Sequence, residues 1–448
     1  MAANLLLRLV ITMHNVNICW FRRDLRLTDN AALYHALSED LPVVPIFIFD
    51  KNILDQLEDR NDRRVQFIYD NIEAMQEQLK GMGSSMEILH GRPDTVFEQL
   101  MVKYHIHQVF ANEDYEPYAL ERDGKIERLL QSRGIALRLY KDQVIFSKND
   151  ILKDNGEPYT VFTPYSRKWK STLDSGSFKS FDNKSIYGRF YQQAPTKIPS
   201  LEDLGFSSAK WDFPTKGWNA EGMKEYADRR NYPGIRGTSR LSTHLRFGTI
   251  SIRKLAAKAS ELSETFLNEL IWREFYQMIC WHFPRVGKGL SFKAEYDLIP
   301  WRNNEEEFIR WCEGATGYPI VDAGMRELNT TGYMHNRVRM ITASFLSKHL
   351  LIDWRWGEAY FAAKLLDFDF ASNNGGWQWA SGSGCDAAPY FRIFSPGRQA
   401  EKFDKDQRYT RTWVPELDSP DYPTPIVDHE FARKRCLQVY QSALRKDQ

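Results

Sequence analysis

Four residues of one predicted helix carry side chains that could bind a flat polar ligand. Within the segment 264–281, the spacing of Glu269, Trp272, Arg273 and Tyr276 places all four on one helix face. The carboxylate and the guanidinium could hydrogen-bond a planar base while the indole stacks on it. The same spacing is also typical of a helix edge with an ion pair between Glu269 and Arg273 and a buried Trp. The pattern alone leaves both interpretations open.

A second group of polar and aromatic residues lies at 367–379. Asp367 and Asp369 flank a Phe, and the run from Asn373 to Trp379 reads NNGGWQW. Adjacent glycines let the backbone approach a ligand closely, and carboxylates can accept hydrogen bonds from ring N–H or ribose groups. This composition predicts contact with a flat ligand. We expect no metal site, because His335 is the only imidazole that the neighbouring polar run supplies.

The segment 237–242 is a candidate phosphate site. It reads GTSRLS and precedes a predicted helix. Hydroxyls, free backbone N–H groups and a helix N-terminus can together bind an anion. A Ser or Thr before a helix is also a common N-cap, which is the alternative interpretation.

The composition excludes several classes of protein. The 448 residues are 42% hydrophobic and 27% charged with a net charge of +1, typical of a globular chain of two or three domains. The sequence has no apolar run long enough for a membrane span, no P-loop, no G-x-S-x-G and no G-x-G-x-x-G after the first predicted strand. Its five cysteines form no C-x-x-C pair, which argues against a zinc ribbon, a four-Cys iron–sulfur site or a disulfide scaffold.

Two parts of the chain differ in periodicity. Up to residue 140, short apolar runs alternate with helical patterns, which predicts a five-stranded parallel, doubly wound sheet. A connector at 141–228 is followed by mainly helical patterns, so the expected fold is an α/β N-terminal domain plus an all-α C-terminal domain. The predicted strands are 16–21, 43–49, 86–89, 108–111 and 136–140, and the predicted helices include 64–79, 93–104, 252–262, 264–281, 304–311, 318–330, 336–349 and 356–366.

Six motifs resemble those of the photolyase/cryptochrome family. They are WFRRDLRLTDN (20–30), GTSRLS (237–242), NELIWREFY (268–276), TGYPIVDA (316–323), MHNRVRM (334–340) and NNGGWQW (373–379). The resemblance runs from about residue 15 to the C-terminus, and it is closest to microbial class I cyclobutane pyrimidine dimer photolyases. It implies an N-terminal extension at 1–14, an α/β antenna-type domain at 15–141, a long connector at 142–225 and a helical FAD- and DNA-binding domain at 226–448.

The resemblance also implies roles for individual residues. It implies that the residues holding FAD are Tyr226, Thr238, Ser239, Arg240, Leu241, Ser242, Arg273, Arg339, Asp367, Asp369 and Asn373. Arg339 would pair with Asp367, and Asn373 would face the flavin N5. The implied electron relay consists of Trp377, Trp354 and Trp301, which with Glu269 and Asn373 form the catalytic set. The implied lesion- and DNA-binding residues are Arg230, Glu269, Trp272, Tyr276, Asn336, Arg337, Met340, Trp379 and Gln399.

The activity that the resemblance implies is light-driven DNA repair. A cyclobutane pyrimidine dimer would be flipped out of the duplex and split by one electron from excited FADH⁻, and the electron would then return. The alternatives are a cryptochrome-like blue-light photoreceptor and a (6–4) photoproduct repair enzyme. The (6–4) chemistry calls for paired imidazoles, where this chain has His335 followed by Asn336. We expect a monomer in the cytoplasm, associated with nucleoid DNA, with no membrane or metal partner.

A second, antenna chromophore is expected, and its identity stays open among a deazaflavin, a flavin and a folate. Folate-using relatives carry an Asn-Glu pair after a Y-x-Y-E-like run, whereas residues 114–119 read DYEPYA here. This difference favours a deazaflavin, a second flavin or an empty antenna site. Two further departures are Tyr333 and Phe266, which stand where relatives have Trp.

Overall fold

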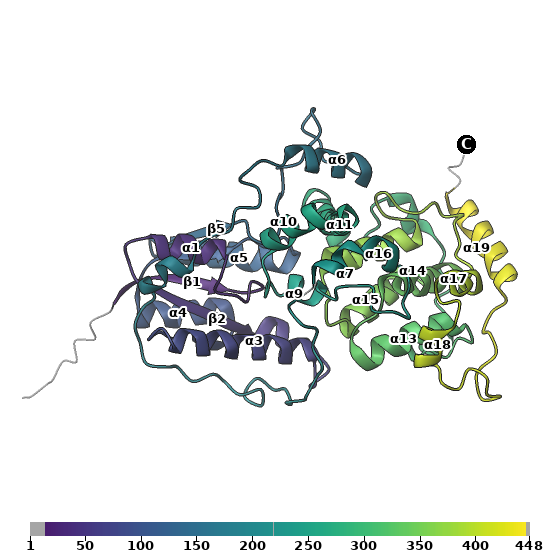
Figure 1. Ribbon diagram of the computed structural model, residues 1–448, viewed down its shortest axis with the longest axis horizontal. Coiled ribbons are helices and arrows are strands. Elements are labelled where there is room, and N and C mark those ends of the chain that lie inside the picture. The colour runs from purple at the N-terminus through teal and green to yellow at the C-terminus, as the bar shows by residue number, and fades with distance from the viewer. Residues whose placement is uncertain (1–13, 218, 445–448) are drawn as a thin grey trace, which may run out of the picture.

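The structure is a computed structural model that describes residues 14–217 and 219–444. Its elements form two lobes (Figure 1). The expected extension at 1–14 lies outside the described residues except for His14. The first lobe holds a five-stranded parallel sheet in the order β3-β2-β1-β4-β5, which confirms the predicted class. Its strands are β1 (Asn15–Phe21), β2 (Val43–Asp50), β3 (Glu87–Gly91), β4 (His105–Asn112) and β5 (Ala136–Tyr140).

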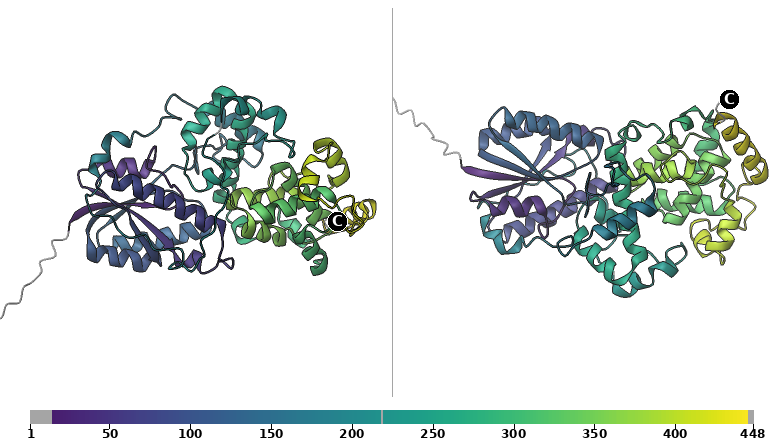
Figure 2. Two further views of the ribbon diagram at one scale, coloured as in Figure 1. Left: turned by 60° about the horizontal axis from the view of Figure 1, so that its bottom comes forward. Right: turned by 90° about the horizontal axis from the view of Figure 1, so that it is seen from above.

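Alternate side chains of β1 enter two different cores. Cys19 and Phe21 face one core, and Ile18 and Trp20 face the other, as the two-residue period of a strand requires. Both faces of the sheet are covered by helices (Figure 2), which is why the strands read as continuous apolar runs. The first core is closed by α1 (Ala31–Ser38) and α3 (Arg63–Lys80), and the second by α4 (Pro93–Lys103) and α5 (Pro117–Gln131). The short α2 (Lys51–Leu54) follows β2.

The second lobe contains helices and loops but no strand among its described residues, and it packs around two large apolar cores. Its longest helix, α11, runs from Glu264 to His282 and crosses α16 (Phe370–Ser381). The other main helices are α10 (Ile252–Leu262), α12 (Glu305–Glu313), α13 (Pro319–Thr331), α14 (Asn336–Ser344), α15 (Trp354–Lys364), α17 (Pro396–Phe403), α18 (Arg408–Trp413) and α19 (His429–Leu444).

Two helical segments differ from the sequence expectation. The helix predicted at 336–349 changes at Phe345 into a π-helical turn that ends at His349. The NNGGWQW run carries no helix prediction, because Asn and Gly are poor helix formers. In the structure it forms most of α16, with Asp369 as N-cap and a left-handed Gly382 as C-cap. These two caps and burial against neighbouring helices outweigh the unfavourable propensity.

The connector predicted at 142–225 wraps over both lobes and contains its own short helices. Helix α6 (Phe162–Thr172) buries Tyr165 and Trp169 against α11. Glu274 of α11 receives hydrogen bonds from Ile145 N at 2.5 Å and from Trp169 Nε1 at 2.5 Å. The connector is therefore anchored to α11 by a buried carboxylate. Shorter helical segments follow at α7 (Ala220–Lys224), α8 (Tyr226–Arg229) and α9 (Ser242–Arg246).

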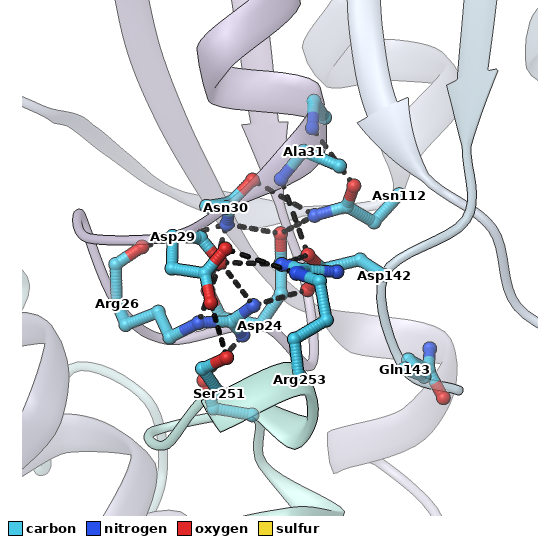
Figure 3. Close-up of polar contacts among 12 residues, drawn as sticks. Asp24, Arg26, Asp29, Asn30, Ala31, Asn112, Asp142, Gln143, Ser251 and Arg253 are labelled. Atoms are coloured by element: carbon cyan, nitrogen blue, oxygen red, sulfur yellow. Dashed lines mark hydrogen bonds and ion pairs between the residues drawn. The ribbon is translucent and has the colours of Figure 1, made fainter. Parts of the chain in front are cut away.

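A buried ionic network joins the two lobes (Figure 3). Arg253 of α10 donates to Asp29 Oδ1 at 2.9 Å and to Asp142 Oδ1 at 2.7 Å. Arg26 donates to Asp142 Oδ2 at 2.6 Å, and Ser251 donates to Asp29. All these side chains are buried. Removing one member of such a set leaves uncompensated charge, so the network fixes how the lobes face each other.

Within residues 14–217 and 219–444, no helix is long and apolar enough to cross a membrane. The same residues contain no group of three or more His, Cys, Asp or Glu side chains placed to hold a metal ion. The five cysteines are all free thiols.

Candidate functional site

Glu269 on α11 pairs with an arginine from another element. Arg230 Nη1 lies 2.5 Å from Glu269 Oε1, and both side chains are about a quarter exposed, at 24% and 28%. Burial raises the pKa of Glu269, and Arg230 opposes that rise. The two groups predicted to contact lesion and DNA therefore meet at a position that a ligand can reach.

The ion pair considered between Glu269 and Arg273 is not formed. Arg273 instead donates to the backbone oxygens of Gln143, at 2.6 Å, and Leu245, at 3.4 Å. Both bonds are partly buried, and they give these carbonyls the donors that backbone groups away from water need. Spacing put both side chains on one helix face, but their long stems turn toward different partners.

Trp272 and Tyr276, one turn apart on α11, are both packed against other elements. The Trp272 ring is stacked on Phe162 of the connector, with centroids 3.7 Å apart and planes at 4°. Tyr276 fills the space beside Gly375 of α16, where an added Cβ would lie 2.3 Å from the ring. One face of the indole is thus covered by protein, and close packing of α11 on α16 explains the glycine at 375.

Asp367 and Arg339 form the expected ion pair. Arg339 Nη2 lies 3.1 and 2.9 Å from the two carboxylate oxygens, and Arg339 Nε donates to Met334 O at 2.7 Å. Asn373 is buried nearby on α16 and donates from Nδ2 to Glu358 O at 3.1 Å. Arg339 of α14 therefore orients the Asp367 carboxylate, and the Glu358 carbonyl orients the Asn373 carboxamide on α16. Both groups could hydrogen-bond a polar ring system.

Asp369 has partners that the sequence did not reveal. Its Oδ2 accepts from Arg23 Nη2 at 2.8 Å and from Tyr115 Oη at 2.8 Å, while Oδ1 accepts from Ser372 N at 3.1 Å. Burial would raise the pKa of Asp369, but Arg23, Arg273 and other arginines outweigh it and hold the pKa well below its usual range. Asp369 thus joins the strand ends of the first lobe to α16. The only sequence signal for this link was that Arg23 lies in the WFRR motif.

The segment 238–242 presents free backbone donors. The N–H groups of Thr238, Ser239 and Arg240 have no hydrogen-bond partner among the described residues. Arg240 is left-handed, with φ of 53°, and its guanidinium lies 4.5 Å from the Tyr333 ring centroid. Consecutive free N–H groups in such a conformation form an anion-binding concavity, and backbone strain often marks ligand clamps. This arrangement fits a phosphate-bearing cofactor such as FAD.

The remaining residues predicted for FAD lie around this segment. Leu241 is buried, and Ser242 begins α9. Tyr226, on α8, is buried with its ring perpendicular to Phe266 at a centroid distance of 5.2 Å. Phe266 therefore forms an apolar wall beside Tyr226.

The start of α14 orients the predicted DNA-binding residues. His335 is the N-cap and accepts from Arg337 N at 3.1 Å, and burial lowers its pKa to about 4, so the ring is neutral. Arg337 donates to Asn231 Oδ1 at 2.6 Å and to Met340 Sδ at 3.8 Å. Asn336 is exposed at the helix start.

Two further predicted DNA contacts lie near this helix. The Arg337 guanidinium lies 4.4 Å from the ring of Phe403, on the same helix, α17, as Gln399. The Gln399 side-chain oxygen is buried without a partner among the described residues. Trp379, half-buried on α16, lies 6.3 Å from Phe394. Arginine, amide and indole groups therefore gather along α14, α16 and α17.

The three predicted relay tryptophans lie on neighbouring segments. Trp377 is 2% exposed, and its ring occupies the space beside Gly357, one turn after the fully buried Trp354. The Trp301 segment is tied to the start of α15 by Arg302 N to Leu351 O at 2.7 Å and by Asp353 N to Asn303 Oδ1 at 2.8 Å. Trp377 and Trp354 are both buried, whereas Trp301, the last residue of the predicted relay, is half-buried.

The chain is thus a two-lobe protein whose helical lobe holds a polar, Trp-rich site tied to the α/β lobe through Asp369. Comparisons with known proteins identify its family. Residues 17–184 match a family model described as DNA photolyase, and residues 266–421 match the FAD binding domain of DNA photolyase. A deoxyribodipyrimidine photo-lyase from Synechococcus sp. is 37% identical over 94% of this chain and 95% of that protein.

Solved structures agree with this match. A bacterial class III photolyase from Agrobacterium tumefaciens superimposes with a TM-score of 0.85, at 33% identity over 96% of this chain and 98% of that one. An archaeal photolyase from Sulfolobus tokodaii was solved with two FAD molecules. It superimposes with a TM-score of 0.83, at 34% identity over 96% of this chain and 100% of that one. The chain belongs to the DNA photolyase family.

Proposed function

We propose that the chain is a light-driven DNA repair lyase that splits cyclobutane pyrimidine dimers. The observation that carries this proposal is the similarity, over almost the whole chain, to proteins named deoxyribodipyrimidine photo-lyase. The placement of the motif residues supports it, because α11 and α14, which bear the proposed pocket, both pack on α16.

In this proposal FAD is held between the 238–242 segment and α16. The free N–H groups at 238–240 bind its phosphate oxygens. The Asp367 carboxylate, oriented by Arg339, accepts hydrogen bonds from the flavin or ribose, and Asn373 presents its amide to the flavin ring. Reduced FAD supplies the excited electron when bound, and the protein positions it and excludes water.

The DNA side of the site binds a flipped dimer. Flipping exposes the dimer to Glu269, which accepts hydrogen bonds, and to the rings of Trp272 and Trp379, which stack on it. Asn336, Met340 and Tyr276 complete the pocket wall. Arg230, Arg337 and Gln399 bind the flanking phosphates, which gives affinity without sequence specificity.

The two alternatives have less support. A photoreceptor of the cryptochrome type shares the flavin and the tryptophan relay but does not need Glu269 next to Arg230. A (6–4) repair enzyme requires a proton-donating pair of imidazoles. Here His335 is neutral with Nδ1 used in capping, and its neighbour is Asn336.

The deciding experiment is repair of a thymine-dimer oligonucleotide under blue light after reduction of the flavin, with a dark control. We expect light-dependent recovery of thymine absorbance. Glu269→Ala and Trp379→Ala should lose repair while retaining FAD, measured from the visible absorption band. Bound FAD without any repair by the wild type would reject the proposal in favour of a photoreceptor.

The wider assignments are also proposals. We propose that the protein is a monomer in the cytoplasm, associated with nucleoid DNA. We also propose an antenna-type domain at 15–141, a connector at 142–225 and an FAD domain at 226–448. The antenna chromophore is a deazaflavin, a flavin or a folate. The Sulfolobus tokodaii photolyase, which was solved with two FAD molecules, supports a second flavin as one of these.

A further inference from the structure

Helix α6 of the connector is docked on α11, and Phe162 is the first residue of the side that faces it. Phe162, Tyr165 and Trp169 are separated by three and four residues, so they lie on one side of α6. The Tyr165 ring centroid lies 5.2 Å from that of Phe275, and Trp169 Nε1 donates to the buried Glu274 carboxylate at 2.5 Å. These two contacts with α11 fix the position of Phe162 at the start of the helix.

The backbone of Phe162 is held by a third element, the loop that follows α16. The first N–H groups of a helix have no partner within it, and the N-cap of α6, Val161, has no side chain that could accept a hydrogen bond. Asp386 fills this role, since its Oδ2 accepts from Phe162 N at 3.0 Å. The preceding residue, Cys385, is buried in the same apolar core as Tyr165. Phe162 is therefore fixed by α6, α11 and the loop together.

Three rings contact the Trp272 indole. Phe162 lies parallel to it at 3.7 Å and 4°, Phe275 stands edge-on at 5.6 Å and 82°, and Tyr276 is tilted by 35° at 5.4 Å. A parallel ring in van der Waals contact leaves an indole no room to turn out of its plane. Trp272 is nevertheless only half-buried, so part of the indole remains open to a ligand. Phe162 thus fixes the plane of a ring that a ligand can still reach.

We propose that Phe162 is a positioning residue for lesion recognition, which holds the Trp272 indole in the plane on which the flipped pyrimidine dimer stacks. The proposal rests on the proposed function, in which Trp272 stacks on the dimer. Stacking on a ring that is already fixed costs less side-chain ordering on binding. Undamaged DNA is bound through its phosphates and presents no flipped base to the indole. Phe162 therefore increases the affinity for damaged DNA alone.

The test compares the affinity of the FAD-loaded protein for one oligonucleotide with and without a thymine dimer, measured in the dark by fluorescence anisotropy. Phe162→Leu, which keeps an apolar side chain but no flat ring, should weaken binding of the dimer oligonucleotide about fivefold, the factor expected from one aromatic pair. Phe162→Ala should weaken it at least as much. Both variants should bind the undamaged oligonucleotide like the wild type. Phe162→Tyr keeps the ring and should retain the wild-type affinity for both.

The matched control is Phe146→Leu, a half-buried connector residue whose ring lies edge-on to Trp169 at 5.4 Å. This variant should change neither affinity. Unchanged binding of the dimer oligonucleotide by Phe162→Leu would overturn the proposal, and so would equal weakening for both oligonucleotides. Tighter binding of the dimer would overturn it too, because Phe162 would then obstruct the indole. Equal affinity of the wild type for the two oligonucleotides would instead reject the proposed function, and this proposal with it.

Discussion

Arg230 Nη1 and Glu269 Oε1 lie 2.5 Å apart, so a proposed phosphate-binding group and a proposed lesion-binding group neutralise each other in the free protein. A DNA phosphate that binds Arg230 competes with the carboxylate. Glu269 then loses its cation and becomes available to the pyrimidine. In the proposed function, the ion pair therefore couples backbone binding to lesion binding.

Arg230→Ala should weaken binding of dimer-containing DNA and reduce the slope of log K against log salt by about one, because one phosphate contact is lost. Fluorescence anisotropy titrations at several salt concentrations measure this slope. The matched control is Arg229→Ala, whose side chain pairs with Glu225 at 2.5 Å and is 44% exposed. Equal slopes for the two variants would remove Arg230 from the DNA contact.

Asp369→Asn should destabilise the protein by about 2 kcal/mol at neutral pH, because Arg23 loses a buried anionic partner. The folded pKa of Asp369 is depressed, so its contribution is complete above the unfolded pKa, about 3.9, and is lost as pH falls. Denaturant unfolding of wild type and variant should therefore converge toward low pH. A stability difference that stays constant down to strongly acidic pH would contradict this role.

The sheet could be predicted from the sequence because strands buried on both faces produce continuous apolar runs. The helix α16 could not be predicted, because its Asn and Gly residues disfavour a helix. The reason for a glycine at 375 is seen only in the structure, where it packs against Tyr276. Helical spacing was also an unreliable predictor of side-chain ion pairs. Glu269 and Arg273 are one turn apart and still choose other partners.

The site residues could be named only through family motifs, and their long-range partners could not be named at all. Arg23 and Tyr115 reach Asp369 across more than half of the chain. No periodicity encodes such a contact, which depends on how two lobes face each other. Phe162 over Trp272 is a similar case, because the connector shows no pattern that places it on α11.

Glu274 should make stability depend on pH near neutrality. Burial raises its pKa to about 7, although Ile145 N and Trp169 Nε1 donate to it. A raised folded pKa means that its stabilisation is complete below the unfolded pKa and is lost as pH rises toward 7, at up to about 1.4 kcal/mol per pH unit. The unfolding free energy of wild type minus Glu274→Gln should therefore fall between pH 5 and 7 and level off above. If the difference in unfolding free energy between wild type and Glu274→Gln does not change between pH 5 and 7, Glu274 stays ionised over that range.

Gly375 and Gly376 are adjacent on α16 and provide a matched test of the helix contact. An alanine Cβ at Gly375 would lie 2.3 Å from the Tyr276 ring, whereas at Gly376 no atom lies within 4 Å. Gly375→Ala should therefore lower the unfolding free energy by about 1–3 kcal/mol through overpacking. Gly376→Ala should raise it by up to about 1 kcal/mol, because alanine is the better helix former. Denaturant unfolding of both variants, with FAD content measured alongside, gives the comparison, and equal effects would show that Tyr276 moves aside at little cost.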